Sequence, residues 1–139
     1  KKRIPQVVSV GACDMVNFGP INTVPEQFLH RNLYKHNPTV TLMRTTVEEN
    51  IKIGEMLGEK WNCAETDMIV MLPKSGVSMI DAEGQPFEGK EERKILFSSI
   101  KNKIHNKYVK IVEMENNIND YEFAVTAAKK LVELMQKKP

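Results

Sequence analysis

Residues 67–73 read Asp-Met-Ile-Val-Met-Leu-Pro, a continuous apolar run that a proline closes. Such a run, without polar alternation, is typical of a strand that is buried on both faces. Two shorter runs are similar to it: Gln-Val-Val-Ser-Val at 6–10 and Tyr-Val-Lys-Ile-Val at 108–112. Parallel sheets are almost always covered on both faces, and their strands read as continuous apolar runs. The three runs therefore predict three strands of a parallel sheet.

A helical pattern follows each of these runs, and the first is the most clearly marked. Thr46 to Glu49 match a capping box, in which the threonine hydroxyl and the glutamate carboxylate satisfy free backbone N–H groups at the start of a helix. The apolar spacing that follows predicts a helix as far as Trp61. Gly54 and Gly58 lie on its inner face, where we expect them to let the helix lie close to the sheet.

The other two helices are predicted from about 91 to 104 and from about 121 to 136, the latter with Met135 on its buried face. Strands that alternate with helices indicate β-α units with right-handed crossovers. The predicted fold class is therefore α/β: a three-layer, Rossmann-like parallel sheet of three β-α units in a single domain, residues 1–139. Three strands leave a sheet edge open, so we expect a partial domain and a homo-oligomer, which uses the edge beside 6–10 or the long segment after it.

Composition and charge argue against several classes of protein. The chain has 139 residues and a formal net charge of +2, with basic and acidic side chains interspersed. This balance argues against a nucleic acid or an anionic membrane surface as a partner. No apolar run is long enough to cross a membrane, so we expect a cytoplasmic protein. Cys13 and Cys63 stand alone, without the spacing of a zinc motif, and we expect free thiols and no metal site.

The segment from Ala12 to Arg44 is long for a connection and shows no long helix or buried strand, apart from a short accessory strand at 39–43. Connections of this length are usually functional or disordered. A carboxylate just after the first strand, Asp14, can orient a ribose hydroxyl, hold Mg²⁺ or act as a general base. The alternative is that it bonds to nearby backbone in an Asx turn. The polar candidates of this segment for a binding site are Asp14, Asn17, His36 and Asn37.

Two further segments complete the predicted binding site. Arg44 and Thr45 precede the first helix, where free N–H groups and the helix dipole favour a phosphate or a carboxylate. The alternative for this pair is a plain helix cap with a solvated arginine. The loop after the second strand contains Gly76, Ser78 and Asp81, a pattern that can form a backbone nest for an anion. Open parallel sheets bind ligands beyond the carboxyl ends of their strands, where we expect all of these residues.

The long segment also carries a resemblance to a known family. Residues 4–8, followed by Gly-Ala-Cys-Asp-Met-Val-Asn-Phe-Gly at 11–19, resemble the Tm-one-like ATP-binding family. Similar segments recur at 23–25, 36–38, 41–45, 49–50, 76–78, 81, 86–87 and 118–120. The resemblance covers essentially the whole chain, and Cys13 stands where the family pattern has Leu.

The resemblance implies a protein of two Rossmann-like halves, of which this chain is the C-terminal part of the second. A plant member of the family binds ATP and blocks tobamovirus replication. ATP with Mg²⁺ is therefore the cofactor that the resemblance implies for the full-length protein. The preceding half is associated with much of the nucleotide contact.

Three functions remain open on the sequence. The leading hypothesis is a ligand-binding α/β module for a nucleotide or another small anionic metabolite, completed by a missing half or a partner subunit. The second is a protein–protein interaction or assembly domain without catalysis. The third is an enzyme of unknown chemistry with Asp14 or Asp81 as general base. No GxSxG, HExxH or GxGxxG motif is present, so no catalytic residue is assigned.

Overall fold

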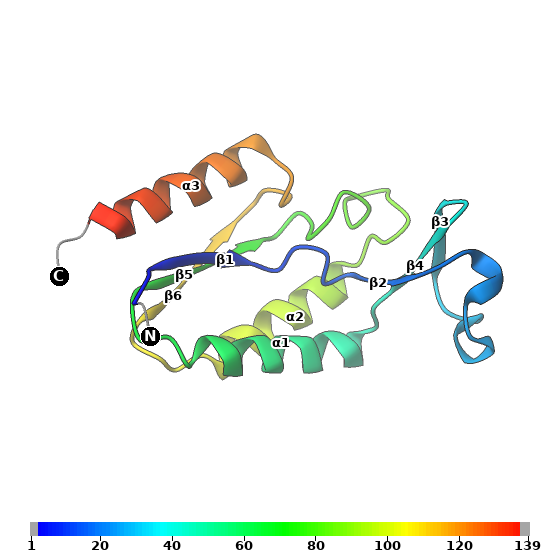
Figure 1. The fold of residues 1–139 in the computed structure, drawn as a ribbon, viewed down its shortest axis with the longest axis horizontal. Helices are drawn as coiled ribbons and strands as arrows, with labels where there is room; N and C mark the ends of the chain where they lie inside the picture. The colour runs from blue at the N-terminus through cyan, green and yellow to red at the C-terminus, as the bar shows by residue number, and fades with distance from the viewer. Residues whose placement is uncertain (1–2, 137–139) are drawn as a thin grey trace.

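The computed structural model describes residues 3–136, which form two small sheets and three α-helices. Parallel strands form the main sheet in the order β1-β5-β6, and antiparallel strands form a second sheet in the order β2-β4-β3 (Figure 1). The strands are β1 Gln6–Ser9, β2 Met15–Phe18, β3 Leu33–Asn37, β4 Val40–Arg44, β5 Met68–Pro73 and β6 Val109–Met114. The helices are α1 Val47–Trp61, α2 Lys90–Lys103 and α3 Tyr121–Gln136, with short 3-10 turns at Ile21–Thr23 and Glu26–Phe28.

The main sheet is parallel throughout, as predicted. β1 and β6 each pair in parallel with β5, which is the central strand and is buried along its whole length. An isolated parallel bridge between Gly76 and Asn117 extends the pairing beyond β5 and β6. The loops that follow β1, β5 and β6 consequently leave the sheet at the same edge, its carboxyl edge.

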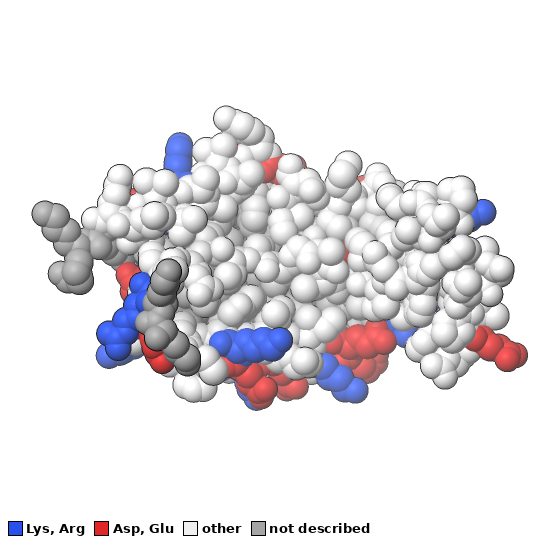
Figure 2. All heavy atoms as spheres, in the orientation of Figure 1, with Lys and Arg blue, Asp and Glu red and all other residues white. Residues whose placement is uncertain are grey.

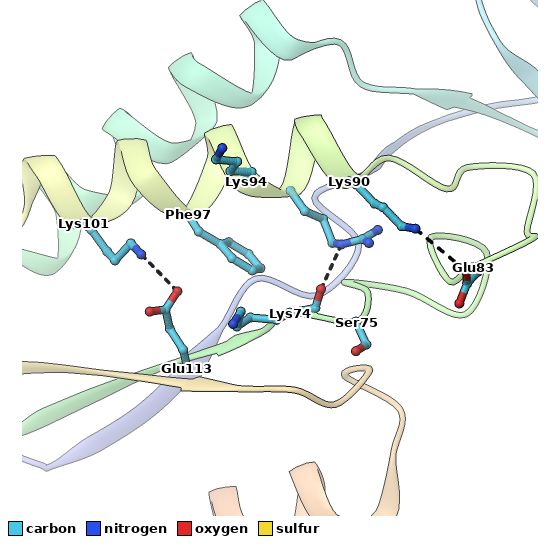
Figure 3. A pocket seen from close by; sticks show the side chains of 9 residues that line it. Lys74, Ser75, Glu83, Lys90, Lys94, Phe97, Lys101 and Glu113 are labelled. Atoms are coloured by element: carbon cyan, nitrogen blue, oxygen red, sulfur yellow. Dashed lines mark hydrogen bonds and ion pairs between the residues drawn. The ribbon is translucent and has the colours of Figure 1, made fainter.

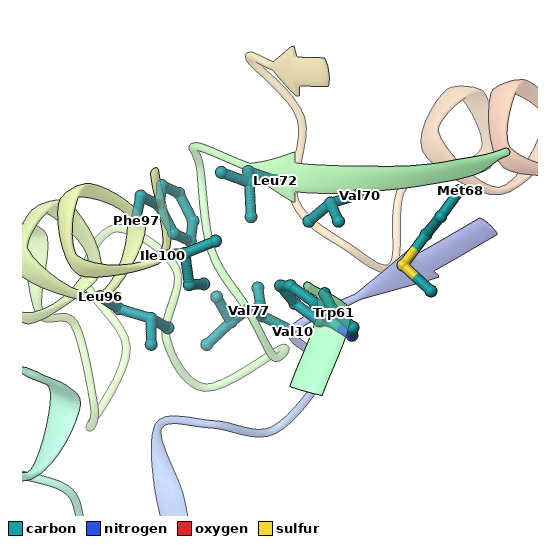
Figure 4. Close-up of a cluster of buried hydrophobic side chains, with 9 residues drawn as sticks. All are labelled: Val10, Trp61, Met68, Val70, Leu72, Val77, Leu96, Phe97 and Ile100. Atoms are coloured by element: carbon teal, nitrogen blue, oxygen red, sulfur yellow. The ribbon is translucent and has the colours of Figure 1, made fainter. Parts of the chain in front are cut away.

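Helices cover both faces of the main sheet. α1 and α2 pack against each other on one face, and α3 lies on the opposite face against β1 and β5 (Figure 1). The larger core lies between the sheet and α1-α2, where Trp61, Val70, Leu72, Leu96 and Ile100 are buried together (Figure 4). The predicted three-layer α/β class, a partial Rossmann-like arrangement, is confirmed.

α1 begins with the predicted capping box and packs differently from the prediction. The Thr46 hydroxyl accepts from the Glu49 N–H, and the Glu49 carboxylate accepts from the Thr46 N–H. A Cβ on Gly54 would lie 2.7 Å from the Ser99 Cβ of α2, and Gly58 approaches α2 equally closely. The expectation that these glycines bring α1 close to the sheet is wrong, because the face that carries them is turned toward α2.

α3 has the predicted bounds but a different buried face. Phe123 and Leu134 are buried, whereas Met135, which was expected inward, is 68% exposed. Successive helical residues are rotated by about 100°, so only one of two adjacent apolar residues can face the sheet. The spacing of apolar residues admits both choices, and contact with the sheet selects Leu134.

The long segment after β1 forms the second sheet, which we call the hairpin sheet (β2, β4 and β3). The accessory strand predicted at 39–43 is β4, but β4 is buried from Thr41 to Arg44, so the expectation of no buried strand here is wrong. Its burial arises because β2 and β3 flank it on both sides. The hairpin sheet projects beyond the carboxyl edge of the main sheet (Figure 1).

β1 is an edge strand of the main sheet in the part of the chain that the structure describes. The surface between α1 and α3, where β1 runs, carries few charged side chains, whereas charges gather along α1 (Figure 2). Within residues 3–136, none of the helices has the length and hydropathy that a membrane crossing requires.

Candidate functional site

A buried carboxylate at the carboxyl edge is bound by four donors. The Oδ1 atom of Asp81, which is fully buried, lies 2.7 Å from Nη1 of Arg93 and 3.1 Å from Nη2 of Arg44. The Gly89 N–H donates to the same oxygen at 3.2 Å, and the Val77 N–H donates to Oδ2 at 3.0 Å. Gly89 is the N-cap of α2, so the carboxylate also lies near the positive end of that helix.

This arrangement has the donors of an anion site, and the anion that it holds is a side chain of the protein itself. Burial raises the pKa of the Asp81 carboxyl above its ordinary value, while the Val77 N–H and the guanidinium groups of Arg93 and Arg44 act against that rise. The other hydrogen bonds of the buried Arg44 also go to protein oxygens. Arg44 therefore neutralises Asp81 in this structure and does not project into an open crevice.

Asp14 lies beside this pair and is held by Ser78. The Ser78 hydroxyl donates to Asp14 Oδ2 at 2.6 Å and accepts from the Asp81 N–H at 3.1 Å. Asp14 is fully buried, and its Oδ1 has no hydrogen-bond partner among the described residues. Burial, and after it the charge of Asp14, raises the pKa of the adjacent Cys13 thiol to about 11. The alternative of an Asx turn does not describe the Asp14 side chain, whose Oδ2 accepts from Ser78 and whose Oδ1 has no partner among the described residues.

Thr45 and Asn50 hold the start of α1 against the loop after β1. The Thr45 hydroxyl donates to the Cys13 carbonyl at 2.8 Å, and the Thr45 N–H donates to the Asp14 carbonyl at 2.9 Å. The buried Asn50 amide donates in turn to the Thr45 hydroxyl oxygen at 3.0 Å. These bonds fix the backbone that carries Asp14.

A pocket of about 440 Å³ opens between the hairpin sheet and the loop after β5, and we call it the hairpin pocket. Its polar lining residues are Asn17, His36, Asn37 and Ser78. Its apolar lining residues are Met15, Val40, Leu42, Met79 and Ile80. A mostly apolar wall with a few polar groups, in a volume of about 300–1,000 Å³, is typical of small-molecule sites.

An irregularity in β3 shapes the polar wall of the hairpin pocket. The pairing of β3 with β4 shifts register between Lys35 and Asn37, so His36 occupies a bulge. Bulges re-aim side chains, and both His36 and Asn37 line the pocket. Asn37 Oδ1 accepts from the Thr39 N–H at 2.9 Å, so this residue forms an Asx turn and also lines the pocket.

A second hollow of about 570 Å³, the basic groove, lies between α2, β6 and the start of the loop after β5 (Figure 3). Its charged lining residues are Lys74, Lys90, Arg93, Lys94, Lys101, Glu83 and Glu113. Most of the cations already have carboxylate partners; Lys101, for example, lies 3.0 Å from Glu113. Because four of these five cations are already paired and only Lys94 lacks a carboxylate partner among the described residues, the hairpin pocket is the stronger candidate site.

One protein-family model matches nearly the whole chain. It is described as the C-terminal domain of an uncharacterised protein family, UPF0261, and it matches residues 1–135. The chain belongs to this family. The resemblance noted in the sequence is thereby confirmed at the level of the family.

Relatives of this UPF0261 domain occur in bacteria and in a plant. A UPF0261 protein of Clostridium tetani is 62% identical over 134 residues, which are 96% of this chain and 33% of that protein. The ToMV resistance protein Tm-1(GCR237) of Solanum lycopersicum is 41% identical over 138 residues, which are 99% of this chain and 18% of that protein. A UPF0261 protein of Mesorhizobium japonicum is 41% identical over 126 residues, 90% of this chain and 32% of that protein. The chain thus spans about a third of the length of these bacterial relatives.

The predicted site residues of this UPF0261 domain fall into two groups, one buried and one at the surface of the hairpin pocket. The buried ones are Asp14, Arg44, Thr45 and Asp81. The ones that line the hairpin pocket are Asn17, Asn37 and Ser78, together with His36. Gly76 has a backbone role: its φ is +146°, and a Cβ there would lie 2.7 Å from the Asp81 carbonyl oxygen. Ligand binding by all of these residues stays a prediction.

The sequence did not single out Arg93 or Asn117, which both support the site. Arg93 holds Asp81, and the Asn117 amide donates to the Ser78 carbonyl at 2.8 Å. Arg93 lies in a run of charged residues, 90–94, and charge alone does not say which of them is buried. A signal was present nevertheless, because Arg93 shares the helical spacing of the buried Leu96 and Ile100.

Proposed function

We propose that this UPF0261 domain is a ligand-binding module for a nucleotide or another small anionic metabolite, which lies in the hairpin pocket. The proposal is supported by one observation above all. Asn17, Asn37 and Ser78, which come from three segments of the chain, line a single pocket beyond the carboxyl edge of a parallel sheet. That is where open α/β sheets bind their ligands. The nucleotide in the proposal rests on the family resemblance in the sequence.

The buried polar cluster holds one residue of the hairpin pocket wall, Ser78, in place. Asp14 and Asp81 together carry the same number of formal charges as Arg44 and Arg93, so the cluster is balanced internally. Ser78 connects this cluster to the pocket, because it bonds to both carboxylate-bearing residues and also lines the pocket wall. A binding group that is held in place before the ligand arrives loses less entropy on binding.

The loop after β5 offers a place for the anionic part of such a ligand. It walls the hairpin pocket with Ser78 and also walls the basic groove with Lys74. Lys94 lines that groove and has no carboxylate within ion-pair distance among the described residues. Because the bacterial relatives are about three times as long as this chain, the proposal includes completion of the site by another part of the protein or by a partner subunit.

Thermal unfolding of the full-length protein with nucleotides and small anions tests this function. A ligand that binds only the folded state raises the unfolding temperature. We expect Ser78→Ala and Asn17→Ala to reduce that shift, because both side chains line the pocket. Ser98→Ala is the matched control, since Ser98 lies on α2 and, among residues 3–136, its hydroxyl bonds only to the Ile95 carbonyl.

Two results would count against the binding module. One is the absence of a shift with every compound of the panel, and the other is a shift that the pocket variants leave unchanged. In either case the interaction or assembly domain becomes the better hypothesis, and capture of a protein partner is then the function to test.

A further inference from the structure

Ser78 presents an acceptor, not a donor, to the hairpin pocket. A hydroxyl group has one hydrogen to donate and two lone pairs that accept. The Ser78 hydrogen is directed at Asp14 Oδ2, 2.6 Å away, and one lone pair accepts from the Asp81 N–H. The lone pair that remains can only accept a hydrogen bond from a group in the pocket.

Asp14 fixes the direction of the Ser78 hydroxyl from behind the pocket wall. Its side chain is fully buried and does not line the hairpin pocket, whereas the residue that follows it, Met15, and the residue that it binds, Ser78, both do. Because its Oδ2 takes the Ser78 hydrogen, Asp14 leaves Ser78 with only an acceptor for the pocket.

Cations are absent from the described wall of the hairpin pocket, whose lining contains neither Lys nor Arg. Arg44 shares its strand with Leu42 of that wall but is not a lining residue of the pocket. Its Nη atoms are bonded to Asp81, Thr45 and the Asp14 carbonyl, and its Nε is buried without a partner among the described residues. A phosphate or carboxylate at Ser78 would meet the negative charge of Asp14 and only lone pairs. This part of the pocket therefore disfavours an anion.

From these observations we infer that the part of the ligand against Ser78 is an uncharged group with hydrogen-bond donors, namely adjacent hydroxyls such as those of a sugar ring. Asp14 is the positioning residue that determines this specificity, because it orients the Ser78 hydroxyl. The inference rests on the proposed binding module and deepens it. The anionic group of the ligand then lies away from Asp14.

The test compares ribonucleosides with their 2′-deoxy and 3′-deoxy counterparts by calorimetry on the full-length protein. Ribose 5-phosphate and inorganic phosphate complete the set of probes. We expect wild type to prefer a ribonucleoside over one of its deoxy forms by up to about tenfold, since the hydrogen bond to the Ser78 hydroxyl oxygen is lost. Asp14→Asn should bring that ratio close to one while affinity for the deoxy form changes little. Ser98→Ala should keep the full ratio.

If Asp14→Asn does not fold, Ser78→Ala takes its place in the test. The affinity ratio of ribonucleoside to deoxy form should fall in this variant too. A wild-type ratio of one overturns the inference, and so does a preference that survives in Asp14→Asn. Binding of phosphate alone, unchanged in both variants, overturns the inference but leaves the anion-binding function standing. Failure of every probe and of the nucleotide panel overturns both.

Discussion

Two guanidinium groups, from Arg44 on β4 and Arg93 on α2, reach the Asp81 carboxylate from different elements. Asp81→Ala leaves both of these buried cations without their shared partner. We expect the variant to lose about 3–5 kcal/mol of unfolding free energy, the range for a buried ion pair that loses one member. Urea denaturation of wild type and variant measures the difference.

A nearby exposed carboxylate serves as the control for Asp81. Glu83 lies in the same loop, 3.8 Å from Lys90, and its side chain is 89% exposed. We expect Glu83→Ala to change the unfolding free energy by less than about 1 kcal/mol, because exposed ion pairs contribute little. Equal losses in the two variants would show that Asp81 does not hold the cluster together.

The two cysteines should react at very different rates. Burial raises the pKa of Cys13 to about 11 from 9.0, so fewer molecules carry the reactive thiolate at any pH below that value. At pH 8 about one Cys13 in a thousand is ionised, whereas Cys63 is exposed. We expect iodoacetamide to label Cys63 first, and the Cys13 rate to climb about tenfold per pH unit until pH 11. Peptide mass spectrometry that finds equal labelling at pH 8 would contradict this.

A site residue was predictable from the sequence where its position directly after a predicted strand was enough to place it at the carboxyl edge of the sheet. Asp14 and Ser78 follow predicted strands, and the rule that ligands bind beyond carboxyl ends brought them into the site. What each side chain bonds to was not predictable, because hydrogen-bond partners come from distant segments. Arg44 was predicted to bind a ligand because its true partner, Asp81, is 37 residues away in the chain and could not be identified from the local sequence.

Among the elements, the α1–α2 contact depends on the absence of a side chain. A Cβ on Gly54 would lie 2.8 Å from the Leu96 carbonyl oxygen, a backbone atom that cannot move alone. Alanine gains about 1 kcal/mol of helix propensity over glycine, but overpacking costs about 1–3 kcal/mol. We therefore expect Gly54→Ala to destabilise the protein in thermal or urea unfolding, by up to about 2 kcal/mol.

Lys52→Ala, on the exposed face of α1, is the control for the helix contact. The free energy of unfolding of Lys52→Ala should stay within about 0.5 kcal/mol of the wild-type value, as is usual for surface substitutions. If Gly54→Ala is more stable than wild type, then α1 and α2 can move apart without losing packing energy, which would contradict the prediction.

Helices and parallel strands were predictable because their patterns are long or wholly apolar. The capping box at Thr46 and the run at 67–73 each indicate one structure only. The hairpin sheet was missed in part because β2 reads Met-Val-Asn-Phe, a short mixed run that becomes a strand only by pairing with β4. Antiparallel pairing across about 25 residues is a tertiary property, which local propensity does not contain.

At the scale of the whole molecule, the open edge of β1 is the feature with the clearest consequence. Edge strands are commonly protected by charge, yet few charges lie on the surface where β1 runs (Figure 2). We expect the 139-residue chain to form a dimer or a larger assembly through this edge. Light scattering should give at least twice the mass of one chain, and Gln6→Lys, on β1, should reduce the association. A monomer mass at high micromolar concentration would contradict the prediction.

The hairpin sheet enters and leaves the main domain at one point, because the Thr45 N–H donates to the Asp14 carbonyl at 2.9 Å. Residues 15–43 are therefore a graft on the first β-α unit, closed at its base by this peptide hydrogen bond and by the Thr45 hydroxyl, which donates to the Cys13 carbonyl at 2.8 Å. Since loops on a rigid frame tolerate exchange, a lineage can replace this graft and acquire a new pocket while it inherits the parallel strands unaltered. The scaffold and the recognition surface are thus free to diverge at different rates.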